Sequence, residues 1–485
     1  MQKTLVLAVP PQPGLLEGFS SGVISLANYV HLHNDDTRVV FADFGPLSAR
    51  RLSESVAEIL KDASSPVFVG ITGTTADYQN MLRTAEAFKS LDPAVVTIFG
   101  GHHATAQDDV VLRRHPVVDF VIRGEGEAAL SSFLQHSDNI DLVPNISFRS
   151  GGAIIRTPEG RLLDQDALDE ISPTIDFDEL RSPPGKFSRI TYVSARGCPL
   201  KCFFCSVRDS AIRAKSVPAV IRDLRRLVEY GYDSIAIEDN FFAHRPRRTL
   251  ELCAAIELLQ QSTRFVWDCQ TRVESMRRND VVAAMARAKC DVVNLGVESL
   301  IADQLQFLGK TPRPRSYLEM LKHEVIPQIM TAGMGVNINL QLGIPGETQF
   351  HRESTLSELA RLGEVARQYG REVVVHPQLH VVYPGTPHFE ESVAAGVFGK
   401  LGAEIFEEFT PWEADNAPIL AYLGEHFAHG TGGLPIGILE AEALRGGEFK
   451  IAECTIATLT RQLMRMRDIP GISVFQYGDH LAIAS

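Results

Sequence analysis

The chain has 485 residues, of which 45% are hydrophobic and 22% charged, a composition typical of a globular protein with two or three domains. Its net charge of −13 argues against a general nucleic-acid-binding protein, because phosphate contacts require a basic surface. No apolar stretch is long enough to span a membrane and the amino terminus lacks a signal-peptide layout, so we expect a cytoplasmic protein.

Residues 1–142 alternate short apolar strands with helical segments such as Leu52–Lys61 and Tyr78–Ser90. This alternation predicts an α/β domain with a Rossmann-like, doubly wound parallel sheet. The expected strands are Thr4–Val9, Val39–Ala42, Val67–Ile71, Val95–Phe99 and Phe120–Ile122.

The loops after these strands are rich in glycine and hydroxyl residues. Ligands of doubly wound sheets bind at the carboxyl ends of the strands, so these loops form a candidate ligand site. The alternative is that they are turns of a purely structural layer. The candidate residues are Thr72, Thr74, Gly100, Gly101, His102, His103, Gly124 and Glu125.

Residues 143–185 are expected to form a connector. Ile146–Phe148 and Ala153–Arg156, which flank two glycines, predict a hairpin. The turn-forming sequence Ser182–Gly185 places a domain boundary near Lys186.

Three of the seven cysteines follow the apolar strand Ile190–Val193 with the spacing C-x₃-C-x₂-C. Cys198, Cys202 and Cys205 lie on one predicted loop, where three thiolates can bind a soft metal or an iron–sulfur cluster. A disulfide cannot use three cysteines, and the remaining, isolated cysteines supply no second pair for a zinc site. We therefore expect a cluster with one iron left open, rather than three inert buried thiols.

In residues 186–389 the predicted strands carry polar side chains at every second position, so these side chains share one face. A polar face repeated over five strands predicts an open interior that holds something polar, because unpaired polar groups are costly to bury. The alternative is that individual residues lie at strand ends in solvent. The residues are Glu238, Asn240, Asp268, Gln270, Arg272, Asn294, Glu298, Asn337, Asn339, Gln341, His376, Gln378 and His380.

Four residues of this face are candidates for binding a polar substrate or moving protons: Asp268, Arg272, His376 and His380. Structural hydrogen bonding inside the barrel is an equally good interpretation.

Residues 390–485 form a small α+β region. Helices are expected at Ala403–Phe409, Pro418–His426 and Ile451–Met466, and a hairpin from Ile472–Tyr477 and Leu481–Ala484. The glycine-rich loop Phe427–Gly433 is either a connector or a lid.

The cysteine loop resembles that of the radical S-adenosylmethionine (SAM) superfamily. The resemblance implies that Cys198, Cys202 and Cys205 ligate a [4Fe–4S] cluster whose fourth iron is chelated by SAM. It also places Phe204 near the adenine and implies a partial (β/α)₆ barrel over residues 186–389.

Later motifs extend this resemblance in order, one motif per strand. Glu238 lies where the family contacts the SAM amino group, although the usual glycines are missing here. Glu298 and Ser299 resemble the ribose and carboxylate motif. The adenine segment is expected at Gly343, Pro345 and Gly346, and Asn339 is counted among the cofactor contacts.

Upstream, Gly-Gly-x-His-Ala-Thr at 100–105 and Arg-Gly-Glu-Gly-Glu at 123–127 resemble the cobalamin-binding domain of B12-binding radical SAM enzymes. The chain lacks the Asp-x-His-x-x-Gly signature that supplies a histidine to cobalt, as do many members of that class. The implied cofactors are therefore the cluster, SAM and cobalamin, although some relatives keep this domain without the corrinoid.

The resemblance implies reductive cleavage of SAM to methionine and a 5′-deoxyadenosyl radical, with an electron donor such as flavodoxin or ferredoxin. Cobalamin-dependent C-methylation of a polar small molecule is the leading hypothesis. Alternatives are a cobalamin-independent rearrangement, dehydration, cyclisation or alkyl transfer from SAM, and a non-catalytic cobalamin or iron–sulfur sensor.

Overall fold

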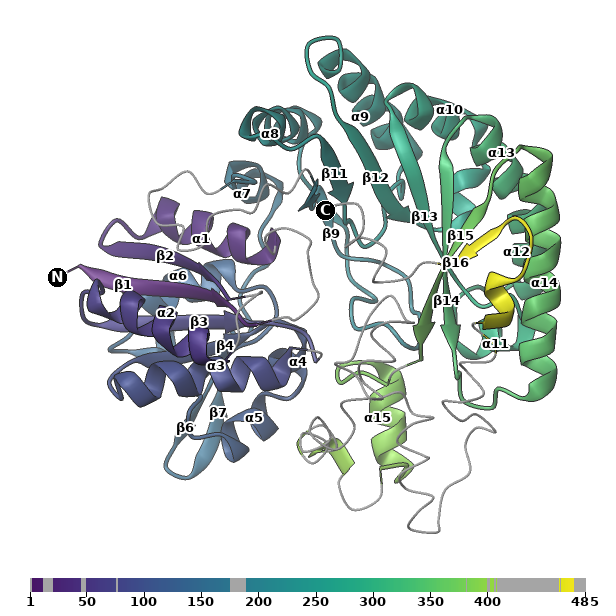
Figure 1. Ribbon diagram of the computed structural model, residues 1–485. Coiled ribbons are helices and arrows are strands. Elements are labelled where there is room, and N and C mark those ends of the chain that lie inside the picture. The colour runs from purple at the N-terminus through teal and green to yellow at the C-terminus, as the bar shows by residue number, and fades with distance from the viewer. Residues whose placement is uncertain are drawn as a thin grey trace. The chain divides into compact units, whose positions relative to one another are not determined.

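The computed structural model describes residues 2–11, 21–44, 49–75, 77–174, 189–380, 382–398, 402–404, 407, 462 and 464–474. The chain divides into two compact units, Met1–Thr191 with Phe398–Thr410, and Tyr192–Val397 with Pro411–Ser485 (Figure 1). Several predicted segments lie outside the described residues: the linker turn 182–185, the helix Pro418–His426, the loop Phe427–Gly433, the strand Leu481–Ala484 and most of the helices Ala403–Phe409 and Ile451–Met466.

The first unit is built on a seven-stranded sheet with the order β2-β1-β3-β4-β5-β6-β7. Strands β1 to β5 are parallel, and β6 and β7 add an antiparallel hairpin. The doubly wound sheet and the hairpin are thus confirmed. The strands are β1 (Lys3–Val9), β2 (Thr37–Asp43), β3 (Val67–Thr72), β4 (Val96–Gly100), β5 (Phe120–Ile122), β6 (Ile146–Ser150) and β7 (Ala153–Arg156).

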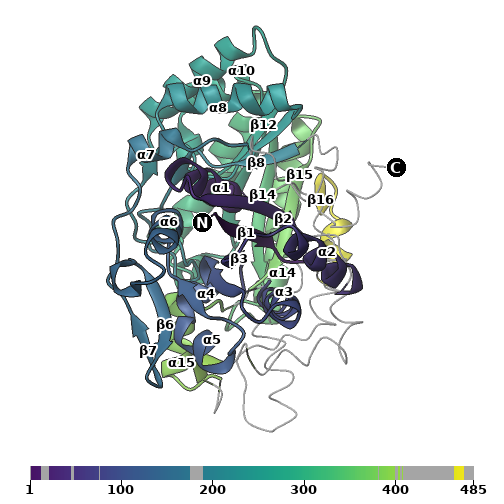
Figure 2. The same ribbon diagram turned by 90° about the vertical axis from the view of Figure 1, so that its left-hand side faces the viewer.

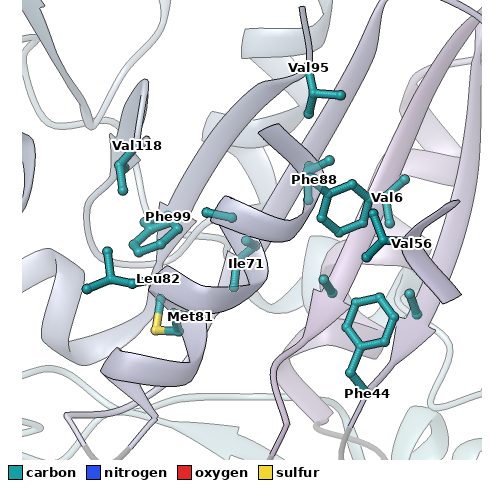
Figure 3. Packing of buried hydrophobic residues seen from close by; sticks show 14 of the residues in the cluster. Val6, Phe44, Val56, Ile71, Met81, Leu82, Phe88, Val95, Phe99 and Val118 are labelled. Atoms are coloured by element: carbon teal, nitrogen blue, oxygen red, sulfur yellow. The ribbon is translucent and has the colours of Figure 1, made fainter. Parts of the chain in front are cut away.

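Helices cover both faces of this sheet, because alternate residues of its strands face opposite sides (Figure 2). Val6 and Ala8 of β1 pack with α2 and α3 in one core (Figure 3). Leu5 and Leu7 pack with α1 and α6 in the other. The helices are α1 (Ser21–His33), α2 (Ala49–Lys61), α3 (Tyr78–Leu91), α4 (Gly101–Ala106), α5 (Asp108–Arg114), α6 (Glu127–Gln135) and α7 (Gln165–Glu170), with the 3₁₀ turn η1 (Ile140–Leu142).

The second unit contains a seven-stranded sheet with the order β16-β15-β14-β13-β12-β11-β8. Strands β11 to β16 pair in parallel, as expected for a radical SAM barrel. The strands are β8 (Arg189–Tyr192), β11 (Ser234–Ile237), β12 (Val266–Thr271), β13 (Cys290–Glu298), β14 (Gly335–Leu342), β15 (Val373–Leu379) and β16 (Ile472–Val474). A separate short ladder joins β9 (Ala195–Arg196) and β10 (Arg213–Ala214).

Helices follow the strands of this sheet and cover one of its faces (Figure 1). Three begin at side-chain caps: the hydroxyl of Ser216 caps α8, that of Thr348 caps α14 and that of Thr386 caps α15. The helices are α8 (Val217–Tyr230), α9 (Pro246–Leu259), α10 (Asn279–Arg287), α11 (Ala302–Phe307), α12 (Pro314–Met320), α13 (Ile326–Thr331), α14 (Gln349–Gln368) and α15 (Pro387–Ala394). Shorter turns are η2 (Val273–Arg277), the π turn η3 (Leu321–Val325) and η4 (Gly402–Glu404).

The predicted alternation is clearest in β14. Val336, Ile338 and Leu340 are buried, whereas Asn337 and Asn339 are half-buried on the opposite face.

Two strand predictions need correction. Strand β11 ends at Ile237, so Glu238 and Asn240 lie beyond it. Ile472–Val474 pairs in parallel with β15, so this segment is a strand of the barrel sheet. In the described part of the chain, no helix is both long and apolar enough to cross a membrane.

Candidate cluster and cofactor sites

The cysteine loop lies between β9 and β10 and is closed by hydrogen bonds across its base. Ser210 N donates to Cys198 O at 2.9 Å, and Cys198 N donates to Ser210 Oγ at 2.9 Å. Gly197 has φ +92°, and a Cβ there would lie 2.3 Å from Ala211 O. The glycine before the first cysteine is therefore required by the tight path of this loop.

The three thiols are brought together in a largely buried setting. Cys198 and Cys202 are 9% and 8% exposed. Burial, together with the nearby Cys202 and Cys198, raises the pKa of Cys205 to about 11. The Cys205 thiol therefore needs bound metal to become a thiolate, and iron supplies that positive charge. Within the described residues, no three His, Cys, Asp or Glu side chains converge on a single ion. The loop fits a cluster, in which each cysteine binds a different iron.

Glu298 is the most constrained of the residues expected to contact SAM. It lies at an irregularity in the β13–β14 pairing and has φ +73°, a left-handed conformation that is costly for glutamate. Its carboxylate accepts from Lys310 Nζ at 3.0 Å and from Gln341 Nε2 at 2.8 Å. A Cβ at position 296 would lie 2.9 Å from Lys310 Nζ, so Gly296 leaves room for this ion pair.

Most of the other expected SAM contacts lie on β14 or after β13 and β14, and Phe204 lies in the cysteine loop. Ser299 is buried and donates to Gln304 Oε1 at 2.6 Å, so its hydroxyl helps to fix the turn before α11. Gly343 has φ +73° and donates its N–H to Glu347 Oε2 at 2.8 Å. Asn339 is half-buried on β14, Phe204 and Pro345 are half-buried, and Gly346 is exposed.

A histidine pair continues the Glu298 network. Gln341 Oε1 lies 2.6 Å from His380 Nδ1, and His380 Nε2 lies 3.0 Å from His388 Nδ1. The ring of His388 stacks on Phe203 of the cysteine loop, with centroids 4.7 Å apart. This chain of contacts links the end of the barrel sheet to the cysteine loop.

The polar face of the sheet carries a second chain of hydrogen bonds. Asn337 Nδ2 donates to Asn294 Oδ1 at 2.8 Å, and Asn294 Nδ2 donates to Asp268 Oδ1 at 3.1 Å. These three residues come from neighbouring strands β14, β13 and β12. The structure therefore brings Asp268 into the polar face, and it places His376 opposite Asn339 in the β14–β15 register.

Arg272 directly follows the last residue of β12 and contacts the cysteine loop. Its Nη1 lies 3.8 Å from Cys202 Sγ, and its Nη2 donates to Lys310 O at 2.5 Å. Its Nε and Nη2 also donate to the carboxylate of Glu274. Arg272 therefore belongs to the cysteine loop's surroundings.

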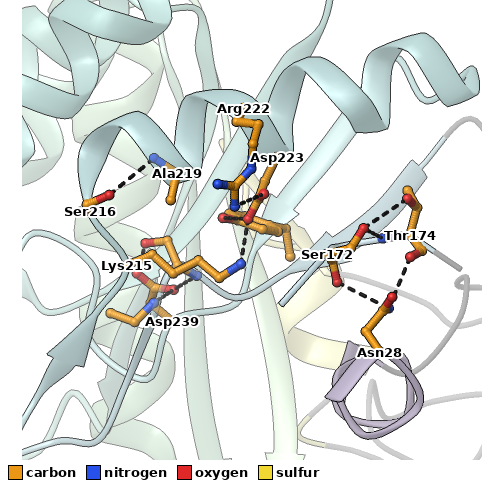
Figure 4. Close-up of polar contacts among 12 residues, drawn as sticks. Asn28, Ser172, Thr174, Lys215, Ser216, Ala219, Arg222, Asp223 and Asp239 are labelled. Carbon is orange, nitrogen blue, oxygen red and sulfur yellow. Dashed lines mark hydrogen bonds and ion pairs between the residues drawn. The ribbon is translucent and has the colours of Figure 1, made fainter. Parts of the chain in front are cut away.

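The sequence predicted Glu238 as a SAM contact but gave no role to its neighbour Asp239. Glu238 is exposed after β11, whereas the buried Asp239 accepts from Ser194 N, Ser194 Oγ and Ala195 N at 2.6 to 2.8 Å. Asp239 thus anchors the chain just before the cysteine loop, close to the buried Lys215–Asp223 ion pair (Figure 4). Burial raises the pKa of Asp239 despite these hydrogen bonds.

The sequence also gave no role to Lys310 and His388, because their contacts with Glu298 and His380 are visible only in the folded structure. A signal for His388 was its place just after Tyr383–Pro384–Gly385–Thr386, the segment that ends the barrel.

The candidate ligand residues of the first unit lie at or just after the carboxyl ends of β3, β4 and β5, and so lie at one edge of the sheet. Gly101 has φ +90°, and a Cβ there would lie 2.3 Å from Gly73 O and 2.9 Å from Thr72 Oγ1. The β3 and β4 loops can therefore approach this closely only with glycine. Gly124, with φ +72°, donates its N–H to Thr105 Oγ1, and a Cβ there would meet nothing within 4 Å.

The two histidines after β4 differ. His102 is exposed. His103 is buried against the Tyr78 ring at 4.0 Å, with Nδ1 3.2 Å from Thr75 Oγ1. Burial lowers the pKa of His103 to about 4. The Thr74 hydroxyl donates to Asp77 Oδ2, and Gly100 and Glu125 are half-buried.

Comparison with known proteins gives both units a class. Residues 16–134 match the B12 binding domain, and residues 192–359 match the radical SAM superfamily. The chain belongs to the class of radical SAM enzymes that carry a B12-binding domain. It is homologous to cobalamin-dependent radical SAM methyltransferases, and the expected family and fold are thus confirmed.

Individual relatives agree with this class. The chain is 26% identical to the uncharacterized methyltransferase PH0819 of Pyrococcus horikoshii, over 80% of this chain and 83% of that protein. It is 29% identical to the anaerobic magnesium-protoporphyrin IX monomethyl ester cyclase of Rubrivivax gelatinosus, over 56% of this chain but only 51% of the cyclase. The radical SAM methyltransferase TsrM from Kitasatospora setae shares the fold, with a TM-score of 0.64 at 14% identity, covering 81% of this chain and 77% of TsrM.

The matched domains imply a [4Fe–4S] cluster, SAM and cobalamin. The buried cysteine loop fits the cluster. The sheet edge after β3, β4 and β5 fits a large ligand, because the exposed backbone of Gly124 has open space where a side chain would point. In the order β2-β1-β3-β4-β5 this edge contains the switch point between β1 and β3, where such sheets bind ligands.

Proposed function

We propose that this enzyme is a cobalamin-dependent radical SAM methyltransferase that acts on a carbon atom of a polar small molecule. One observation carries the proposal: a B12 binding domain and a radical SAM domain with an intact cysteine loop occur on one chain. When bound, the cluster and SAM supply a 5′-deoxyadenosyl radical and the corrinoid supplies a methyl group.

The chain's own residues hold and orient these groups. Cys198, Cys202 and Cys205 ligate the cluster. The carboxylate of Glu298 is fixed by Lys310 and Gln341 before SAM arrives, so SAM binding orders little side-chain freedom there. Gly124 lets the backbone approach the corrinoid closely.

The substrate class follows from the polar face of the barrel sheet. Asp268, Asn294 and Asn337 are linked to one another, and Asn294 and Asn337 remain half-buried. An apolar ligand covering these groups would leave hydrogen-bonding capacity unpaired, at a cost of about 1–3 kcal/mol per group. An amino acid, sugar, phosphonate or short peptide would pair with them. The TsrM structure contains a bound tryptophan substrate, which supports this class by analogy.

The test is anaerobic turnover of the reconstituted enzyme with SAM, hydroxocobalamin, a chemical reductant and a panel of amino acids, sugars and peptides. Methyl transfer predicts 5′-deoxyadenosine and S-adenosylhomocysteine in equal amounts, with a product heavier by one CH₂. The reductant stands in for a low-potential donor such as flavodoxin or ferredoxin. If an intact cluster yields no 5′-deoxyadenosine with any substrate, the enzyme proposal fails and a sensor role replaces it.

Radical ring closure is a second candidate, because one relative is named as a cyclase. Ring closure would form 5′-deoxyadenosine without stoichiometric S-adenosylhomocysteine, and its product would gain no CH₂.

A further inference from the structure

Arg272 places a fixed cation against one cysteine of the cluster loop. The residue follows β12, 70 positions after Cys202, and its Nη1 lies 3.8 Å from Cys202 Sγ. This distance is suitable for an N–H···S hydrogen bond from the guanidinium to the sulfur.

The guanidinium is held by other groups, which leave Nη1 directed at the sulfur. Nη2 donates to Lys310 O at 2.5 Å and to Glu274 Oε1 at 3.0 Å, and Nε donates to Glu274 Oε2 at 3.2 Å. The Arg272 side chain is only 11% exposed. A planar fork held at several points loses little further freedom when it binds sulfur.

The position of the anchors also connects this contact to the SAM site. Lys310, whose carbonyl anchors Arg272, pairs through its side chain with Glu298. Leu308 O, two residues earlier, accepts from Phe203 N in the cysteine loop. The segment after α11 therefore fixes the loop, the arginine and the Glu298 carboxylate together.

Arg272 stays charged in this setting. A guanidinium is protonated throughout the pH range in which proteins are stable, and Glu274 pairs with it at 3.0 Å. Because Glu274 is bound on the Nε and Nη2 side, the Nη1 side is the one that meets Cys202.

We propose that Arg272 sets the reduction potential of the [4Fe–4S] cluster through a charge-assisted hydrogen bond to the Cys202 thiolate. Reduction adds one electron from an external donor to the cluster, makes the cluster with its thiolates more negative by one charge, and breaks no bond. A donor cation fixed at the sulfur binds the more negative form more strongly, so it favours reduction. This role depends on the cluster and not on methyl transfer.

The experiment is a redox titration of the full chain with reconstituted cluster, without SAM, cobalamin or substrate. Dithionite is the reductant, and electron paramagnetic resonance measures the reduced cluster. Arg272→Gln should lower the equilibrium constant for reduction at least tenfold, which corresponds to a potential about 59 mV more negative for a one-electron couple. Arg272→Lys keeps the charge without the anchored fork and should shift the potential less, in the same direction.

Arg277→Gln is the matched control. Arg277 lies in the next turn, η2, where it pairs with Glu324 on the surface, so its loss should leave the potential unchanged. Iron content per chain shows whether each variant holds a full cluster. If Arg272→Gln fails to assemble the cluster, the potential of Arg272→Lys shows whether Arg272 changes the reduction potential.

A second readout reports the contact itself. In protein labelled with ¹⁵N-arginine, the reduced cluster should show a ¹⁵N hyperfine coupling that disappears in Arg272→Lys and persists in Arg277→Gln. A wild-type potential at full iron content in Arg272→Gln, or in Arg272→Lys if Arg272→Gln assembles no cluster, would overturn the proposal. A shift that appears only after SAM is added would overturn it as well, because Arg272 would then act on SAM. Neither result bears on whether the enzyme transfers methyl groups.

Discussion

His380 Nε2 accepts a hydrogen bond from His388 Nδ1 across 3.0 Å. The direction follows from Gln341, which donates through Nε2 to Glu298 and so accepts through Oε1 from His380 Nδ1. A neutral His380 that donates from Nδ1 can only accept at Nε2. His388 then donates from Nδ1, which leaves its Nε2 as an acceptor beside the cysteine loop.

This pair predicts a pH dependence of folding stability. Burial lowers the pKa of His380 to about 3, helped by the nearby His388, and burial lowers the pKa of His388 to about 4. Between these values and the ordinary pKa near 6.5, the unfolded chain binds protons that the folded chain does not. The contribution of these histidines to the free energy of unfolding is therefore fully present above about pH 6.5. As the pH drops below this value, the free energy of unfolding falls by about 1.4 kcal/mol per pH unit for each histidine.

Denaturant unfolding of the cluster-free chain at several pH values between 7 and 5 measures this slope. His388→Phe should make the slope shallower, because one buried neutral histidine is lost. His323→Gln is the matched control, because it removes a histidine that lies on the surface beside Glu319. An identical slope in wild type and His388→Phe would contradict the prediction.

The Lys310–Glu298 ion pair predicts a large stability cost when only one partner is removed. Both side chains are at least nine-tenths buried, and Lys310→Met leaves the Glu298 carboxylate without its cation. We expect a loss of about 3–5 kcal/mol in the free energy of unfolding, with part of it restored by adding Glu298→Gln. Arg247→Met breaks an exposed pair with Glu251 and should cost less than about 1 kcal/mol. Equal losses in the two single variants would show that the buried pair has no special role.

Much of the fold was predictable because it depends on local patterns. The five strands of the first unit, its hairpin and the alternation along β14 all follow from the period of two in apolar residues. The end of β11 could not be predicted from the sequence. The residues after Ile237 continue the strand pattern, and only the structure shows that Asp239 leaves the strand to accept hydrogen bonds from Ser194 and Ala195.

The candidate site was predictable only in part, for a related reason. The three cysteines lie within eight residues of sequence, whereas the contacts of Arg272 with Cys202, and of His380 with Gln341, join residues 70 and 39 positions apart. Strand periodicity predicted a polar-face position for Arg272, but periodicity along one strand does not predict the contact of Arg272 with Cys202.

The cysteines themselves give a prediction with an internal control. Cys202→Ala should leave too few thiolates for a stable cluster, and it should abolish both the bound iron and the formation of 5′-deoxyadenosine from SAM. Cys253→Ala removes an equally small side chain that is fully buried in α9, so it should cost stability but keep the iron. Iron analysis and chromatography of the reaction mixture measure both effects. Loss of iron in Cys253→Ala alone would point to a different ligand set.

Two glycines with a positive φ test the proposed position of the corrinoid. Gly124 at the edge of the first sheet has φ +72° and Gly151 in the β6–β7 hairpin has φ +58°, and a Cβ at either position meets nothing within 4 Å. Alanine should therefore cost each site a similar strain, about 1–2 kcal/mol. Only at Gly124 would the new methyl group enter the space proposed for cobalamin. We expect Gly124→Ala to weaken corrinoid binding roughly tenfold, which is about 1.4 kcal/mol, while Gly151→Ala binds like wild type. Absorbance of the corrinoid retained per chain, at matched thermal stability, measures the difference. Equal retention in the two variants would move the corrinoid site away from the loop after β5.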